Sequence, residues 1–499
     1  MLKSLFYIEA MIVIGTAIFY MASTPAIRRE VGILPGLVFG AMAAIGFLSP
    51  NLIVAYLAVG LIPLIFGRTK LKVGIVVATA LFALPSLPTN MTIGSVWLFS
   101  WTMQTTVAVG GLIAMLVAPG RLAKAPPWAD ASMIIVILVL IFVDARGGAP
   151  TGYLRGFTTY FLQFAVLVYL ITRCARTPVE WRALLAALAA IGCILAVLVL
   201  YEARANWPLY SPLYYRYGFP VENVVKFRGG LMRAYGPLEE ATALGAVLVM
   251  CFCAALAGRR AFRSNLAYIG IVALIAIGTL APQSRGGMIG IAVAFVVSSF
   301  YRRGIGSVSQ VGLAALLLSG IYAGTTVFGS FGAQVATSLE DASGSGDYRT
   351  ELLRRGMQEF WKSPIIGDSY ANVVARMQDM VQGEGMVDFV NTYLYFALFA
   401  GAIGLVLFCI SFLIPMGRLV QIRQSLPPGS AEREVAGFCL AVLVSAAVMI
   451  TFTSYLPRPS VMWLAAASMA LIVVGPRRAR AGRPAIEPQI KLSGDPIPA

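Results

Sequence analysis

The sequence contains no histidine, and only 12% of its 499 residues are charged. The absence of histidine excludes acid–base catalysis by imidazole, Ser-His-Asp triads and His-ligated metals. The charged fraction is well below the roughly 25% of ordinary soluble domains, while 59% of the residues are hydrophobic. The six cysteines lie in or beside apolar runs and none lies in a long polar loop, so neither a disulfide framework nor a zinc site is expected.

Runs of apolar residues recur along the whole chain, and many are long enough to cross a hydrocarbon layer of about 30 Å. They predict an all-α, polytopic transmembrane helical bundle with about 12–15 spans. The first run carries Glu9 and is too long for a cleaved signal peptide, so it is interpreted as a span. The predicted spans lie near 5–23, 31–48, 51–67, 73–89, 94–118, 131–145, 155–172, 183–202, 238–257, 265–281, 287–301, 309–328, 389–416, 435–454 and 459–475.

The net charge of +16 comes from basic loops that recur after every second span. The positive-inside rule places these loops, and the C-terminus, in the cytoplasm. Nucleic-acid binding is not expected, because no basic run is interleaved with stacking aromatic residues. The other side, the periplasm in a bacterium, receives long loops near 203–237 and 329–388 and the short turn before Arg285.

Arginines on that side are candidates for anion binding. Arg228 and Arg233 lie close together in the first long loop, where two glycines allow close backbone approach. Arg285 lies in a Ser-Arg-Gly-Gly turn that opens the next predicted span, where a helix N-terminus also favours a phosphate. The alternatives are ordinary surface charge for the first pair and interfacial snorkelling for Arg285.

The second long loop contains an amphipathic pattern that begins at Asp347, a candidate helix cap, and ends near Pro364 and Gly367. Arg349 lies on its polar side, which is otherwise interpreted as a solvated face. The pattern's apolar positions are Leu352, Leu353, Met357, Phe360 and Trp361.

Two carboxylates, Glu384 and Asp388, precede the span that starts near Asn391. Such residues can simply cap a helix, but without histidine a general base on this side must be a carboxylate or a weaker group. The tyrosine-rich segment 206–219 fits an interfacial aromatic belt, with sugar stacking as the minority interpretation.

In their order and spacing these segments resemble the family of O-antigen ligases and O-antigen or exopolysaccharide polymerases. The resemblance covers roughly residues 200–404, and Val390 stands where the ligases have a histidine. Chain polymerisation is therefore favoured over transfer to lipid A core, with Asp388 as the nearest replacement for that histidine. The matching motifs are Arg233–Gly236, Ser284–Gly287, Pro364–Gly367, and Asn391 with Gly401 and Gly404.

The resemblance implies a metal-independent, cofactor-free glycosyltransferase of the GT-C type. It would act at the periplasmic face of the bacterial inner membrane on oligosaccharides linked to undecaprenyl diphosphate. Arg233 and Arg285 would hold the diphosphate, supported by Arg228 or Arg349, and Asp388 would act as base or orient the acceptor. Other implied substrate contacts are Asn391, Glu384, Ser284 and Tyr235.

Membrane lipids and a polysaccharide co-polymerase are the expected partners. The alternatives are an O-antigen ligase, a lipid-linked saccharide transporter or flippase, and a scaffold subunit of an export complex. The expected organisation is an N-terminal transmembrane part (1–200), a ligase/polymerase-like core (201–404), C-terminal transmembrane helices (405–476) and a disordered cytoplasmic tail (477–499).

Overall fold

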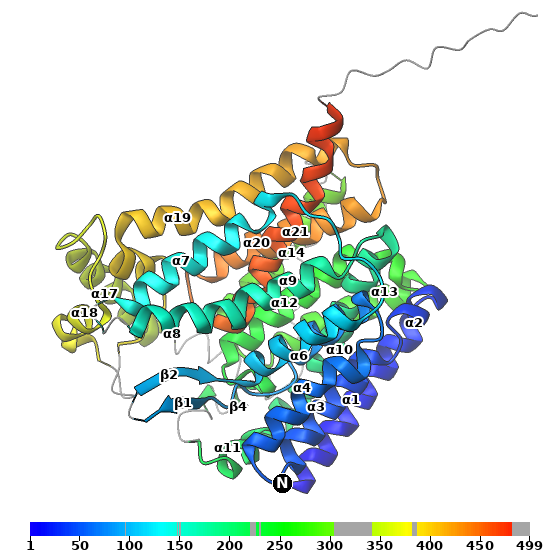
Figure 1. Cartoon of the computed structure of the whole chain (residues 1–499), viewed down its shortest axis with the longest axis horizontal. Coiled ribbons are helices and arrows are strands. Elements are labelled where there is room, and N and C mark those ends of the chain that lie inside the picture. Colours follow the sequence, from blue (N-terminus) through cyan, green and yellow to red (C-terminus); the bar gives the residue numbers. More distant parts are fainter. Residues whose placement is uncertain are drawn as a thin grey trace, which may run out of the picture.

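The computed structural model describes residues 1–94, 96–146, 148, 151–219, 226–228, 231–303, 342–381 and 387–481. It is an all-α bundle with two small hairpins (Figure 1). The helices of the first part are α1 (Leu2–Ala22), α2 (Pro25–Glu30), α3 (Leu34–Leu48), α4 (Leu52–Phe66), α5 (Lys70–Ala80), α6 (Met103–Val117), α7 (Ala131–Ala145), α8 (Thr151–Tyr160), α9 (Leu167–Arg173) and α10 (Pro178–Ala205).

The later helices are α11 (Ser211–Arg216), α12 (Ala241–Ala257), α13 (Asn265–Gly278), α14 (Arg285–Arg303), α17 (Ala342–Phe360), α18 (Tyr370–Arg376), α19 (Thr392–Ile422), α20 (Ala431–Met449) and α21 (Pro457–Ala481). Single turns of other helix types are η1 (Pro127–Asp130), η2 (Phe161–Val166), η3 (Gly236–Leu238), η4 (Arg259–Ala261), η5 (Gln378–Met380) and η6 (Arg423–Ser425). The strands are β1 (Thr89–Ile93), β2 (Val96–Trp101), β3 (Phe227–Arg228) and β4 (Leu231–Met232).

Seven helical stretches in the described part are long and apolar enough to cross a membrane, and four shorter apolar helices accompany them. This confirms the predicted all-α, multi-pass membrane fold. The predicted span at 309–328 lies outside the described residues.

Helix α10 is the centre of the bundle. Thr177 and Glu180 form a capping box at its start, and it then runs for 28 residues through the core. Small residues bring its neighbours close: a Cβ on Gly15 of α1 would lie 2.7 Å from the Ile194 Cα, and one on Gly278 would lie 2.8 Å from the Ala196 Cα. Close backbone approach of this kind is how membrane helices gain packing energy.

Contacts divide the bundle into two ends. At the basic end, formed by residues 23–33, 67–69, 118–126, 174–177, 258–264 and 423–430, Arg182 pairs with Glu434 at 2.7 Å and the Arg263 N–H donates to the Ala22 carbonyl at 2.9 Å. The described residues of the loop end are 81–94, 96–102, 203–219, 226–228, 231–240, 279–284, 342–381, 387–391 and 450–456. In Figure 1, α17, α18 and the β1–β2 hairpin lie at the left of the view, away from α2 and the last turns of α21.

The region between α5 and α6 differs from the prediction of two continuous spans at 73–89 and 94–118. Helix α5 ends at Ala80, and β1 and β2 form an antiparallel hairpin before α6 begins. Pro85 and Pro88 cannot continue a helix, Gly94 turns the chain with a φ of +61°, and the aromatic residues after it favour a strand.

Helix α17 also differs from the prediction, because it begins at Ala342 and Asp347 therefore lies inside it instead of capping it. Its apolar positions divide into two groups. Leu352 is buried and Phe360 packs against the core, whereas Leu353, Met357 and Trp361 are exposed.

Candidate functional site

The N-terminal ends of α12 and α14 touch at the loop end. A Cβ on Gly287 would lie 3.3 Å from the Gly245 Cα, so two glycines permit this contact. The Ser284 hydroxyl accepts a hydrogen bond from the Gly287 N–H at 3.4 Å and so caps α14. Both helix dipoles therefore add positive potential at one place.

Arg285 is the first residue of α14, and Arg233 reaches the same turn from β4. The Arg233 Nε donates to the Pro282 carbonyl at 3.2 Å, and the Ala234 N–H donates to the Ala281 carbonyl at 3.1 Å. Arg285 is half-buried, and no ion pair to it is found among the described residues. The structure thus brings together the two arginines that the sequence assigned to one site.

Arg349 of α17 is a third cation at this place. Its Nη2 donates to the Phe452 carbonyl at 3.3 Å. Burial and the charge of Arg285 lower the pKa of Arg349, while Asp388 acts in the opposite direction. An anion bound between two neighbouring cations relieves their repulsion.

The other two arginines of α17 form ion pairs with carboxylates of the same loop. Arg354 pairs with Glu351, and Arg355 makes two hydrogen bonds of 2.9 Å to the Asp379 carboxylate. Of the three arginines on this helix, Arg349 is therefore the one directed at the site.

Asp388 precedes α19 in the sequence, four residues before the first helical residue, Thr392. Its carboxylate accepts a hydrogen bond from the Ser454 hydroxyl at 2.7 Å, and its backbone carbonyl accepts one from the Tyr348 hydroxyl at 3.2 Å. Val387 and Phe389 are buried, whereas Asp388 and Val390 are half-exposed. Asp388 and Val390 are thus the two partly accessible residues of the segment 387–390.

Glu240, which the sequence analysis did not place in the site, is a second carboxylate near Asp388. It is the N-cap residue of α12, and its side chain is exposed at the loop end. Partial desolvation of the carboxylate raises the pKa of Glu240 although the residue keeps accessible surface. The charges of Glu239 and Asp388 also raise this pKa, whereas a hydrogen bond from Thr242 and the charge of Lys226 lower it. A raised carboxyl pKa is typical of general bases that work near neutral pH.

The adjacent Glu239 has a structural role. Its carboxylate accepts hydrogen bonds from the N–H and hydroxyl of Ser86, and Arg458 pairs with it at 3.7 Å. Arg458 is buried and also donates to the Pro237 carbonyl at 2.8 Å. No sequence pattern marked Arg458, because its partners come from distant parts of the chain.

The span predicted near 238–257 begins slightly later, because η3 comes first and α12 starts at Ala241. Gly236 and Glu239 both have positive φ, +50° and +70°, which interrupts the helix at this turn. Glu202 is fully buried at the end of α10, and its carboxylate accepts a hydrogen bond from the Gly236 N–H at 2.9 Å. This hydrogen bond holds the turn in place. Glu240 is therefore held in a constrained position.

The other residues predicted to contact the substrate do not all lie on the accessible surface of this site. Asn391 caps α19 by accepting the Leu394 N–H at 3.1 Å, and Tyr235 is buried beneath the site with 1% of its surface exposed. Only the backbone of Arg228 is described, in β3, and Glu384 lies outside the described residues.

Residues 364–368 of the second long loop, which we call the strap, form backbone hydrogen bonds with α19. The Asp368 N–H donates to the Leu398 carbonyl, and the Ala402 N–H donates to the Pro364 carbonyl, both at 2.8 Å. Gly401 interrupts the helix with φ +65° and ψ −168°, and a Cβ there would lie 2.5 Å from the Gly367 nitrogen. Two of the motifs noted in the sequence are thus the two halves of one contact.

The tyrosine-rich segment packs against the bundle. Tyr210 and Tyr214 are buried, and the Tyr217 hydroxyl donates to the Gly46 carbonyl at 2.8 Å. Tyr215 is 72% exposed and is the tyrosine of this segment that remains accessible for a sugar.

Comparison with known families gives one match: residues 270–409 match the family described as O-antigen ligase. No curated protein matches the chain. The matched region contains Arg285, Arg349, Asp388 and the Gly401 break, whereas Arg233 and Glu240 lie before it.

Proposed function

We propose that this multi-pass membrane protein, whose residues 270–409 match the O-antigen ligase family, is a polymerase of lipid-linked saccharides. The family supports membrane glycosyl transfer of the O-antigen ligase or polymerase kind. The observation that carries the proposal is the gathering of Arg233, Arg285 and Arg349 beside two carboxylates at one end of the bundle.

In the proposed reaction, the hydroxyl oxygen of an acceptor sugar forms a bond to the anomeric carbon of the donor. The bond between that carbon and the diphosphate oxygen breaks, and the electron pair leaves with the lipid diphosphate. The arginines and the N-termini of α12 and α14 stabilise the charge of this leaving group. Asp388 or Glu240 takes the proton of the attacking hydroxyl.

Polymerisation is favoured over ligation by the residue at position 390. Val390 is an apolar side chain that packs partly against the core, so it cannot do what the histidine of the ligases does. Asp388, two residues earlier and equally accessible, is the group that replaces it in our proposal.

Reconstitution into vesicles without any ion gradient tests this function. Lipid-diphosphate-linked repeat units, together with lipid A core as a second acceptor, are supplied on the side of the loop end. We expect a ladder of elongated lipid-linked product. Glycan attached to lipid A core would instead show a ligase, and lipid that crosses the membrane without new glycosidic bonds would show a flippase.

A further inference from the structure

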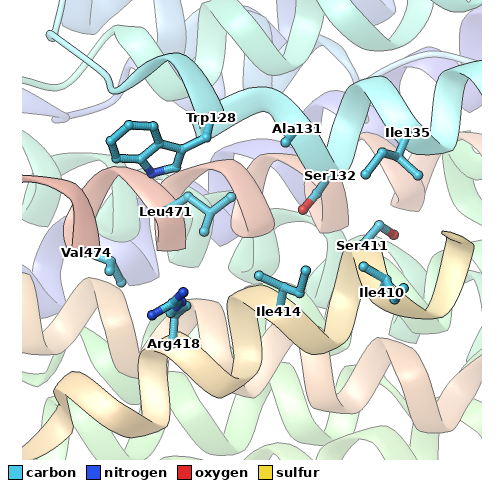
Figure 2. A pocket seen from close by; sticks show the side chains of 10 residues that line it. All are labelled: Trp128, Ala131, Ser132, Ile135, Ile410, Ser411, Ile414, Arg418, Leu471 and Val474. Atoms are coloured by element: carbon cyan, nitrogen blue, oxygen red, sulfur yellow. The ribbon is translucent and has the colours of Figure 1, made fainter.

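A cavity of about 320 Å³ lies between α7, α19 and α21, and Figure 2 shows the side chains that line it. Its residues belong to the halves of α19 and α21 that lead to the basic end. At roughly 30 Å³ per water molecule it is about ten waters in size. Its rim is open at Trp128 and Ile414, each of which is 51% exposed. Its lining includes Ser132, Ile135, Ile410, Arg418 and Leu471.

Two polar side chains in this cavity have no hydrogen-bond or ion-pair partner among the described residues. Arg418 is half-buried, and neither a hydrogen bond nor an ion pair to its guanidinium is found in the described ranges. Ser132 is 4% exposed, and Figure 2 shows its hydroxyl pointing into the cavity, where no described residue binds it. Buried polar groups normally have hydrogen-bond partners.

The charge of the site favours an anion. The nearby carboxylate of Asp130 is already occupied, by Arg173 at 2.7 Å and by the Ser468 hydroxyl at 2.7 Å. It is therefore not available to neutralise Arg418. A guanidinium and a hydroxyl on opposite walls can together bind the oxygens of one phosphate.

The rest of the cavity lining is mostly apolar, which favours a lipid over a free anion as the ligand. Ile135, Ile410 and Leu471 supply hydrocarbon surface directly beside the polar pair. In Figure 2 the Trp128 ring lies at the same end of the cavity as Arg418. Tryptophan prefers the headgroup level of a bilayer, and basic side chains at the same depth attract anionic lipids.

We propose that this cavity is a binding site for an anionic phospholipid of the leaflet at the basic end. The lipid phosphate binds Arg418 and the Ser132 hydroxyl, and the start of an acyl chain lies against the isoleucines. The three helices that line the cavity reach the loop end near Arg146, Asn391 and Arg458. A bound lipid thus ties together the helices that support the candidate site.

Native mass spectrometry of the full chain, titrated with phosphatidylglycerol or phosphatidylcholine, tests the proposal independently of any enzymatic activity. We expect the wild type to prefer phosphatidylglycerol. Arg418→Gln should weaken that binding about tenfold, the cost of losing one hydrogen-bonded charge, and Ser132→Ala should weaken it less. Arg121→Gln removes an exposed arginine of the same end and should change nothing.

Equal phosphatidylglycerol affinity in Arg418→Gln and the wild type would overturn the proposal. Equal affinity of the wild type for both lipids would do so as well, and displacement of the lipid by millimolar inorganic phosphate would indicate a free-anion site instead. If Arg418→Gln fails to fold, Ser132→Ala decides, because unchanged binding in that variant contradicts the assigned hydroxyl contact.

Discussion

At the scale of single residues, the two glycines at the contact between the loop and α19 have little room for a side chain. Gly401 has a backbone conformation that is essentially restricted to glycine. Gly367 has φ +71°, and a Cβ there would lie 2.5 Å from the Leu398 carbonyl oxygen. Neither position has room for a side chain, so the two backbones are in direct contact at these glycines.

We therefore expect Gly401→Ala to destabilise the protein by at least 1–3 kcal/mol, roughly the cost of the strained backbone alone. Gly417→Ala is the matched control in the same helix, because nothing lies within 4 Å of a Cβ at that position. It should be neutral or stabilising by about 0.5–1 kcal/mol. Thermal melting in detergent compares the two variants, and equal melting temperatures would contradict the strap geometry.

Glu240 gives a prediction about pH. If it is the base, it must be deprotonated to work, and its pKa lies above the usual 4.5. Activity should then fall as the pH drops through that raised pKa, and Glu240→Gln should abolish turnover while lipid-linked donor still binds. Initial rates between pH 4 and 9 measure this, and full activity in Glu240→Gln would assign the proton to Asp388.

At the scale of elements, an ionic network holds the second long loop together. Arg376 of α18 pairs with Glu359 of α17 at 2.7 Å and with Asp368 of the strap at 2.8 Å. Burial alone would raise the pKa of Asp368, but hydrogen bonds from Asn372, Arg376 and the Ser369 N–H outweigh it and lower the pKa to about 2.

This network predicts acid sensitivity of the loop. A carboxyl group with a lowered pKa contributes stability that is fully present above its unfolded pKa, here 3.8, and is lost as the pH falls toward 2. Arg376→Gln should increase protease cleavage within 361–381 at neutral pH and remove this acid transition. Arg354→Gln, which breaks an exposed pair within one helix, should leave cleavage unchanged.

The sequence predicts elements better than it predicts contacts between them. Hydropathy located α10, α14 and α19 to within a few residues, because a long apolar run in a membrane has few alternatives to a helix. The β1–β2 hairpin was missed because residues 94–118 are apolar enough to resemble a span. The roles of Glu240 and Arg458 depend on which loops fold back together, which no local pattern encodes.

At the scale of the whole molecule, the basic end and the loop end lie on opposite sides of the bundle. Because the positive-inside rule assigns basic loops to the cytoplasm, the loop end should face the other compartment. Thr92 in the β1–β2 hairpin and Gln424 in η6 are both exposed and lie at opposite ends of the bundle.

In a cysteine-free background, Thr92→Cys should react with a membrane-impermeant maleimide on intact spheroplasts. Gln424→Cys should react only after the membrane is opened. Labelling of both residues from the same side would reject the two-ended arrangement, and the reverse pattern would place the arginine cluster in the cytoplasm.

The most direct test of the arginine cluster is the rate of chain elongation by purified Arg285→Gln and Arg349→Gln proteins, compared with Arg354→Gln on the same loop helix. We predict a loss of at least 100-fold for Arg285→Gln, on the order of the loss from removing one transition-state donor, with a clear loss also for Arg349→Gln. Arg354→Gln should elongate chains at the wild-type rate. Elongation by folded Arg285→Gln protein at the wild-type rate would contradict the assignment of this cluster to the departing diphosphate.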